Sequence, residues 1–343
     1  RSVEEKMRRL IERTVGFCIT LFYSSIVVLS YLIHPVRFVK GLFNRKKRDV
    51  VPKCLNDPKL GTHGYIHLED VRIHYVANGE EGKPLMLFVH GFPEFWYSWR
   101  FQLREFSKDY RVVAMDMRGY SDSDKPKGIS NYTSDKIAAD IKQLVSALGY
   151  SDCVLVGHDW GGSIVYTVTI MYPEVVKKLI VLNAPHPGAF KKYMQTSWTQ
   201  FKKSWYMFLF QMPCLPEFVF KHDDYSVLER MMTSKEIKTI TPEDVEAYKY
   251  AFSRPGGGFT GPLNFYRAAF RTDPARAKLL LKKITTPTLV VWGKKDLALN
   301  SELAENGRDY ITDLTVKYVE NASHWVQMDE PEETNKYIRE FLE

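Results

Sequence analysis

The sequence predicts an α/β protein in which a mostly parallel sheet is covered by helices on both faces. Short apolar segments recur along the chain, and stretches with helical periodicity separate them. This alternation stops between residues 185 and 283, where the sequence is helical and interrupted by prolines. We therefore expect a helical insertion in the sheet domain. An uncharged apolar run near the amino terminus predicts a further, transmembrane helix before the sheet begins.

The expected strands follow from local patterns. Residues 64–78 alternate between apolar and polar side chains on both sides of a short turn, which predicts a hairpin. The later strands are short and apolar, as buried parallel strands are. They are expected at residues 85–89, 111–116, 152–157, 179–183, 288–292 and 315–319.

Charge and composition exclude several classes of protein. The net charge of +7 comes from residues 1–53, which hold 12 Lys/Arg and 4 Asp/Glu, because the remainder holds 36 against 37. A nearly neutral body has no electrostatic footprint for nucleic acid. Four cysteines in 343 residues are too few for a disulfide framework, so a reducing compartment is expected.

Residues 15–33 contain no charged side chain, and such a helix would be about 28 Å long, close to the thickness of a bilayer core. A signal peptide would have a shorter apolar region and a small-residue cleavage site, and a buried core helix is the remaining alternative. We expect residues 1–60 to form a membrane anchor and a basic linker, with Pro35 ending the helix. The expected partner of residues 15–33 is a lipid bilayer.

The orientation of this anchor rests on the basic residues beside it. Seven Lys/Arg lie between residues 34 and 53 and five precede the apolar run, which favours the placement of residues 61–343 on the cytosolic side of the endoplasmic reticulum. The glycosylation sequons at Asn131 and Asn321 are the observation in favour of the opposite orientation.

The insertion at residues 185–283 is expected to be a cap over a pocket. Between residues 190 and 225, 11 of 36 side chains are aromatic, about twice the frequency in the whole chain. Aromatic side chains of this density form the apolar wall of a pocket or pack the cap onto the sheet. Residues 61–184 and 284–343 are then the two parts of the core domain.

The clearest chemical motif surrounds Asp159. An apolar strand is followed by Gly157-His158-Asp159-Trp160-Gly161 and then by a helical pattern, which is the form of a nucleophile elbow. From about residue 64 to the carboxyl terminus the chain resembles the α/β-hydrolase fold. The Asp at the apex makes it similar to the epoxide hydrolases in particular. The apolar amino-terminal segment resembles the membrane-anchored, single-domain branch of these enzymes.

An aspartate at this position has a defined chemistry. A carboxylate that attacks a saturated carbon leaves an ester, which an activated water molecule can cleave, whereas serine would leave an ether. The carboxylate also needs no deprotonation at neutral pH, since its ordinary pKa is about 3.9. Asp159 is therefore expected to be a nucleophile toward an epoxide or an alkyl halide.

The resemblance implies the remaining catalytic residues. Asp296 follows the strand expected at 288–292, at the position of the family's acid, and His324 follows the last strand, at the position of its base. His324 would activate water and Asp296 would orient the His324 ring. The loop His90–Glu94 resembles the family's oxyanion loop, so that the backbone N–H groups of Phe92 and Trp160 would stabilise the tetrahedral intermediate.

Two cap tyrosines complete the set implied by the resemblance. Tyr206 and Tyr266 match the phenols that protonate the epoxide oxygen, although the aromatic sequence around Tyr206 also permits an alignment shifted by one helical turn. The expected reaction converts a lipophilic epoxide, such as a fatty-acid epoxide, and water to a vicinal diol. No cofactor and no metal are expected. The alternatives are a haloalkane-type dehalogenase and a catalytically silent receptor of the same fold.

Overall fold

A single eight-stranded sheet forms the centre of the molecule. The computed structural model describes residues 2–233, 239–254, 257–271 and 274–343. Within these residues the strand order is β1-β2-β4-β3-β5-β6-β7-β8. The strands are β1 (Thr62–His67), β2 (Arg72–Asn78), β3 (Leu85–Val89), β4 (Arg111–Met115), β5 (Cys153–His158), β6 (Val176–Leu182), β7 (Thr288–Gly293) and β8 (Leu314–Val319).

The sheet is parallel except at one edge. β1 pairs antiparallel with β2, and β2 with β4, whereas every other neighbouring pair is parallel. The predicted mostly parallel α/β class is therefore confirmed. The predicted hairpin is β1 and β2. The largest error in a strand boundary is at β6, which begins at Val176, three residues earlier than expected, because Lys177 and Lys178 interrupt the apolar pattern there.

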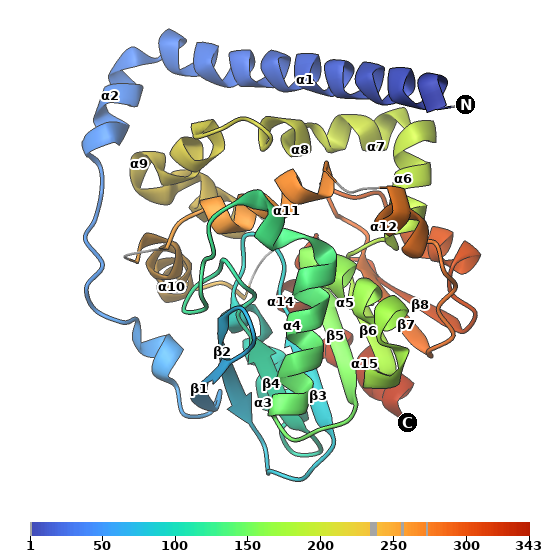
Figure 1. Ribbon diagram of the computed structural model, residues 1–343. Helices are drawn as coiled ribbons and strands as arrows, with labels where there is room; N and C mark the ends of the chain where they lie inside the picture. The colour runs from blue at the N-terminus through green and yellow to red at the C-terminus, as the bar shows by residue number, and fades with distance from the viewer. Residues whose placement is uncertain (1, 234–238, 255–256, 272–273) are drawn as a thin grey trace.

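Helices cover both faces of the sheet, which explains why the central strands are apolar throughout. Every residue of β3, β5 and β7 is buried. In Figure 1, α4 (Ser134–Ala147) and α5 (Trp160–Met171) lie in front of the sheet, and α3 (Arg100–Phe106) and α15 (Pro331–Leu342) lie behind it. Each buried Val, Leu or Ile contributes about 1.5–3 kcal/mol, so this core supplies a rigid support for the loops at the strand ends.

The segment between β6 and β7 is helical, and we call it the cap. Figure 1 shows it above the carboxyl ends of the strands. Its helices are α6 (Pro187–Thr196), α7 (Trp198–Lys203), α8 (Trp205–Leu209), α9 (Leu215–Met232), α10 (Pro242–Ser253), α11 (Thr260–Ala269) and α12 (Pro274–Leu279). α9 bends at Asp223, Asp224 and Tyr225, which all have positive φ values. Short helices also follow β7 and β8, namely α13 (Glu302–Glu305) and α14 (Val326–Asp329).

Two helices precede the sheet. α1 (Ser2–Ile33) contains a segment, Leu10–Ile33, that is long and apolar enough to cross a membrane. α1 ends two residues before Pro35, as expected, but Pro35 then occupies the first turn of α2 (Pro35–Phe43). Proline is tolerated there because the first helical N–H groups have no partner in the helix. The predicted linker therefore begins as a helix. α1 lies along the outer side of the cap (Figure 1).

Candidate active site

Four loops meet at the carboxyl edge of the parallel sheet. The register pairs Val89 of β3 with Gly157 of β5, and Gly293 of β7 with Val319 of β8, so that the strands end at neighbouring positions. The loops that follow these strands carry Phe92, Asp159, Asp296 and His324. The sheet topology therefore brings together residues that are up to 232 positions apart in the sequence.

Asp159 occupies the turn between β5 and α5. Its backbone has φ 50° and ψ −119°, a conformation that non-glycine residues rarely adopt and that costs about 1–3 kcal/mol. Two glycines make room for this turn. A Cβ on Gly161 would overlap the carbonyl oxygen of Val89, and a Cβ on Gly91 would lie 2.5 Å from the Asp159 Cβ. Glycine at both positions lets the sharp turn direct the Asp159 carboxylate away from the strand.

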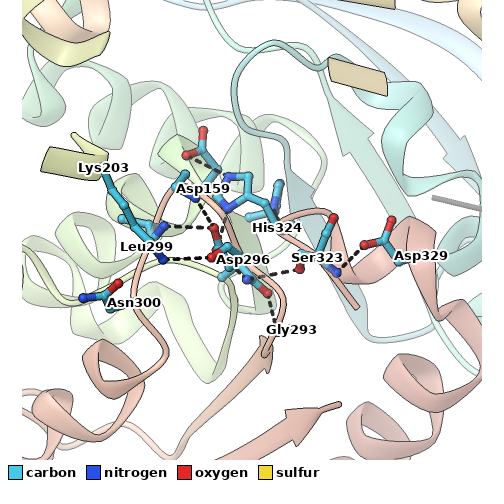
Figure 2. A network of polar contacts seen from close by, with 12 residues as sticks. Asp159, Lys203, Gly293, Asp296, Leu299, Asn300, Ser323, His324 and Asp329 are labelled. Carbon is cyan, nitrogen blue, oxygen red and sulfur yellow. Dashed lines mark hydrogen bonds and ion pairs between the residues drawn. The ribbon is translucent and has the colours of Figure 1, made fainter. Parts of the chain in front are cut away.

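The two oxygens of the Asp159 carboxylate face different groups. Oδ1 accepts a hydrogen bond of 2.8 Å from the backbone N–H of Phe92. Oδ2 lies 3.4 Å from Nε2 of His324 (Figure 2). One oxygen is therefore held in the oxyanion loop while the other stays beside the imidazole ring.

His324 is oriented from its other side by Asp296. Nδ1 of His324 lies 2.8 Å from Oδ2 of Asp296, and Oδ2 also accepts from the Asn183 side chain at 2.7 Å (Figure 2 shows the His324 contact). Oδ1 of Asp296 accepts from the backbone N–H groups of Ala298 and Leu299, at 2.7 and 2.9 Å. Hydrogen bonds of this kind favour the charged carboxylate, which in turn fixes the imidazole ring.

Electrostatics set the protonation of the three side chains. Burial would raise the pKa of Asp159, but the hydrogen bond and charge of His324 outweigh burial, so this pKa lies below its usual value. Burial likewise opposes the charged form of Asp296, yet His324 and Asn183 hold its pKa below the usual value. For His324, burial favours the neutral ring, but the charge of Asp296 and the contact with Asp159 raise its pKa well above 6.5. The two carboxylates therefore favour the protonated form of the imidazole ring between them.

A second buried network supports the backbone beneath these residues. Nδ1 of His158 lies 2.7 Å from the Glu94 carboxylate, and its Nε2 lies 2.8 Å from the carbonyl oxygen of His324. Glu94 also accepts from the Gly91 N–H at 2.7 Å and from the Gln327 side chain at 2.9 Å. The network connects the loop after β3, the end of β5 and the loop that carries His324.

An apolar cavity of about 510 Å³ lies beside Asp159, which is one of its lining residues. Its walls come from α5, α6, α8, α11 and α12, so the cap forms most of it. Asp159 and Lys191 are the only charged side chains among its lining residues in the described part of the chain. Aromatic and aliphatic side chains predominate, including Phe190, Met194, Met207, Phe265, Leu280 and Leu281.

Tyr206 of α8 and Tyr266 of α11 both line this cavity, with ring centroids 6.0 Å apart. Burial raises the pKa of both phenols above 10, and the negative charge of Asp159 raises each further. Both hydroxyl groups therefore stay protonated at neutral pH. The arrangement provides two O–H donors in the same apolar cavity as a carboxylate.

The structure thus brings the residues named from the sequence into one site. Asp159, His324 and Asp296 lie in contact, and Phe92 donates its N–H to Asp159. The Phe92 N–H donates a hydrogen bond to Oδ1 of Asp159. In the part of the chain that the structure describes, the Trp160 N–H makes no hydrogen bond to this oxygen. The role of the Trp160 N–H in a tetrahedral intermediate therefore stays a prediction.

Sequence reasoning missed the residues that support the site. Asn183 bonds to both Asp296 and the Gly293 N–H, at 2.7 and 2.9 Å, and has a φ of 40° directly after β6. The sequence did contain one signal for Asn183: Asn tolerates a positive φ, so an Asn at the end of a strand indicates a sharp turn. Glu94 and His158 belong to the expected motifs, but nothing local in the sequence indicates that they pair across 64 positions.

Comparisons with known proteins agree with this architecture. A family model described as the alpha/beta hydrolase fold matches residues 84–331. Epoxide hydrolase 4 of Homo sapiens is 45% identical over 345 aligned residues, covering 98% of this chain and 94% of that protein. Epoxide hydrolase 1 of Caenorhabditis elegans is 44% identical over 339 residues, covering 97% of this chain and 81% of that protein.

Solved structures give the same result. The crystal structure of a Bacillus megaterium epoxide hydrolase in complex with an inhibitor superposes with a TM-score of 0.74 at 34% identity, and the match covers 81% of this chain and 99% of that chain. The sequence similarity extends over nearly the full length of the relatives, and the sheet, the elbow and the helical insertion are all present. This chain therefore belongs to the alpha/beta hydrolase fold family and, within it, to the epoxide hydrolases.

Proposed function

We propose that this protein hydrolyses lipophilic epoxides to vicinal diols through a covalent ester on Asp159. In the first half-reaction Oδ2 of Asp159 attacks one ring carbon and forms a C–O bond. The bond between that carbon and the epoxide oxygen, on the side opposite to the attack, breaks at the same time. The epoxide oxygen takes a proton from Tyr206 or Tyr266. Ring strain and the two O–H donors together favour this opening.

The second half-reaction hydrolyses the ester. Once the carboxylate is esterified, Asp159 no longer carries the negative charge that helps to raise the pKa of His324. The pKa of His324 falls, so that the ring gives up its proton, which returns to the tyrosine that protonated the epoxide oxygen. The neutral Nε2 then takes a proton from water while the resulting hydroxide attacks the ester carbon. The Phe92 N–H stabilises the negative charge that develops on Oδ1. The bond between the Asp159 carboxyl carbon and Oδ2 then breaks, the diol oxygen takes the proton of the added hydroxyl group, and the Asp159 carboxylate is restored.

One observation carries this proposal: a carboxylate nucleophile and two protonated phenols line the same apolar cavity. An alkoxide leaving group needs O–H donors, and an ordinary ester substrate would not need the phenols at all. The competing dehalogenase reaction needs N–H donors for a halide. The Trp160 ring packs edge-on against the Tyr266 ring, with centroids 4.8 Å apart, beside the proposed phenol donor.

Isotope transfer in a single turnover tests the mechanism. Excess enzyme and a styrene-type epoxide react in H₂¹⁸O, and mass spectrometry measures the first diol. The expected diol is unlabelled, because its new oxygen comes from Asp159, and the peptide that contains Asp159 gains the label. Direct attack of water would put the label in the first diol. Faster halide release from a haloalkane than diol formation would favour the dehalogenase.

The cavity and the amino-terminal helix support a more specific assignment. The cavity walls are mainly hydrocarbon, which suits long-chain substrates such as fatty-acid epoxides. We further propose that residues 1–60 attach the enzyme to the endoplasmic reticulum membrane, with the core (residues 61–184 and 284–343) and the cap (residues 185–283) in the cytosol. An endoglycosidase-sensitive glycan on Asn131 would reverse this orientation.

A further inference from the structure

The amino-terminal helix α1 has two faces of different character. Along its inner side Thr20 and Ser24 are 5% and 3% exposed, and Tyr23 and Tyr31 lie partly buried beside them. With the partly buried Val27 between them, these positions recur every three or four residues and so form one stripe of the helix. The stripe contains the buried hydroxyl groups of Thr20 and Ser24 and two tyrosines, whereas Ser25 and Ser30 lie on the exposed side. The face of the helix that packs on protein therefore carries polar groups within an apolar segment.

The inner stripe contacts the cap along its length. The Thr20 hydroxyl donates to the carbonyl oxygen of Phe208 at 3.0 Å, and the Tyr23 ring lies 5.7 Å from Trp205 of α8. Eight residues further on, Tyr31 packs edge-on against Phe218 of α9, with ring centroids 5.8 Å apart. From Thr20 to Tyr31 the contacts span about 16 Å of helix axis. α1 therefore lies lengthwise on the cap, as Figure 1 shows.

The outer face of α1 is apolar and uncovered. Phe17, Phe22, Leu29 and Leu32 are 53–67% exposed, and each is surrounded by further aliphatic side chains. A continuous apolar surface of this length marks an interaction with a partner or a membrane. Large apolar side chains that face outward from a helix packed on protein are typical of helices whose outer solvent is lipid.

The same contacts are incompatible with a helix that crosses the bilayer while docked on the cap. A crossing helix would bring the cap surface beside Thr20 and Tyr31 to the depth of the hydrocarbon. Asp223 and Arg230 of α9 lie close enough to the Tyr31 hydroxyl to interact with it electrostatically. Ionised groups at that depth are costly. An α1 that lies in the plane of the membrane avoids this cost and exposes its apolar face to lipid.

The flanks of α1 indicate the charge of that membrane. Five Lys/Arg precede the apolar run and seven follow it, so both ends favour the same, cytosolic side. At the bend between α1 and α2 a surface cavity of about 740 Å³ is lined by His34, Arg37 and Lys40, beside apolar Val36. Asp223 lines the same cavity, so the basic side chains outnumber the carboxylate among its lining residues in the described part of the chain. Basic groups next to exposed apolar side chains fit the headgroups of anionic lipids.

The segment after α2 fixes this arrangement to the cap. The Asn44 side chain donates to Asp223 at 2.7 Å. Both terminal nitrogens of the Arg48 guanidinium bond to the Asp224 carboxylate at 2.7 Å, and both side chains are less than 10% exposed. A buried bidentate pair is among the stronger polar contacts in proteins. We propose that α1 is an in-plane anchor, docked on the cap, through which the enzyme binds one leaflet of an anionic membrane. This inference rests on the membrane attachment proposed above.

Photocrosslinking of the full-length enzyme on vesicles of phosphatidylcholine and phosphatidylserine tests the docked orientation. Photoreactive p-benzoylphenylalanine replaces Tyr23 in one variant and its outward-facing neighbour Phe22 in the other. The Tyr23 variant is expected to crosslink to the peptide that contains α8, and the Phe22 variant to lipid. Lipid adducts at both positions, without a crosslink to the cap, would overturn the docked orientation. If neither variant sediments with vesicles, the membrane attachment itself fails.

A matched pair of substitutions sharpens this result. In the Tyr23 crosslinking variant, Ser24→Leu enlarges the buried stripe and is expected to reduce the crosslink to α8. Ser25→Leu adds the same group on the exposed face and should leave the crosslink unchanged. Equal yields in the two variants would contradict docking through the inner stripe.

Proteolysis distinguishes an in-plane helix from a crossing one. When the enzyme is added to sealed vesicles, trypsin outside them is expected to cut after both Arg13 and Lys47. Protection of one of these two sites would show that α1 crosses the bilayer. Arg37→Gln should weaken binding to the phosphatidylserine vesicles about fivefold, whereas Lys336→Gln on the distant α15 should not. An equal effect of the two substitutions would contradict the basic site at the bend.

Discussion

The two sides of the active site are built from different kinds of structure. Asp159, Asp296 and His324 follow strands whose parallel ladder fixes their register, and each has several hydrogen-bond partners from neighbouring loops. Tyr206 and Tyr266 come instead from α8 and α11, helices of five and ten residues in the cap.

This difference separates two requirements of the proposed reaction. Nucleophile, base and acid must keep their mutual distances in every turnover, and a sheet edge holds them rigidly. The phenols must meet the oxygen of substrates that differ in shape, and short cap helices with large aromatic neighbours can adapt to them. We therefore expect substitutions at the sheet edge to reduce activity on all epoxides, and substitutions in the cap to act in a substrate-dependent way.

The largest loss is expected at the nucleophile. Asp159→Ala removes the atom that forms the ester, so diol formation should fall by about 10⁴-fold or more on every epoxide. Steady-state diol formation measures this loss. Retention of a few per cent of the activity, after exclusion of contaminating wild-type enzyme, would mean that water attacks the epoxide directly.

His324→Gln should stop the reaction after the first half. The ester can form, but no base activates water, so that turnover falls by about 10³–10⁴-fold while the protein gains the mass of one substrate molecule. Intact-protein mass spectrometry detects the ester, and peptide mapping places it on Asp159. An inactive variant that gains no mass would separate His324 from the second half-reaction.

Asp296→Asn is expected to slow ester hydrolysis by about 10³-fold and to move its pH dependence. The charge of Asp296 raises the pKa of His324, so its removal lowers that pKa. The base is then neutral at lower pH, and the acid limb of single-turnover ester decay shifts in the acid direction. Rapid-quench measurements across pH check this shift, and an acid limb that moves to higher pH would contradict the assignment.

Tyr206→Phe and Tyr266→Phe test the cap side of the comparison. Either loss of an O–H donor should slow ester formation by about 10²-fold, with a larger effect in the double variant and with ratios that change among epoxides. Tyr193→Phe removes a phenol from the same cap that bonds to Asn300, and it should have little effect. Uniform losses on all substrates would contradict the adaptable role of the cap.

The smallest effect on activity is expected at Asp329, whose carboxylate accepts the Ser323 N–H at 2.6 Å beside the His324 loop. Burial raises its pKa to about 6, so the folded protein binds more protons than the unfolded chain between about pH 4 and 6. Stability therefore falls as the pH rises through this window. Asp329→Asn should remove at most about 3 kcal/mol of this pH dependence. Urea unfolding at several pH values measures it.

Local patterns in the sequence predicted most of the architecture. The strands were recognisable because buried parallel strands are apolar along their length, and Gly157 and Gly161 marked the turn around Asp159. Asp296 and His324 followed predicted strands, and parallel strands end at one edge, so their proximity to Asp159 was predictable. Their catalytic roles stay predictions.

Other features depend on tertiary contacts that no local pattern records. The pairing of Glu94 with His158 depends on how two loops meet after the strands pair. The packing of α1 depends on the surface of the cap, because an apolar run does not indicate which of its sides contacts protein. The second helix, α2, was missed because Pro35 can either follow a helix or begin one.

The pairing of Arg48 with Asp224 has a practical consequence for production of a truncated, water-soluble enzyme. A chain that starts at residue 61 lacks Arg48 and leaves the Asp224 carboxylate with Lys249, 3.6 Å away. We expect that cut to destabilise the cap by about 1–3 kcal/mol. A start immediately before Asn44 removes both apolar helices and keeps the guanidinium in place, so it is the better boundary for crystallisation.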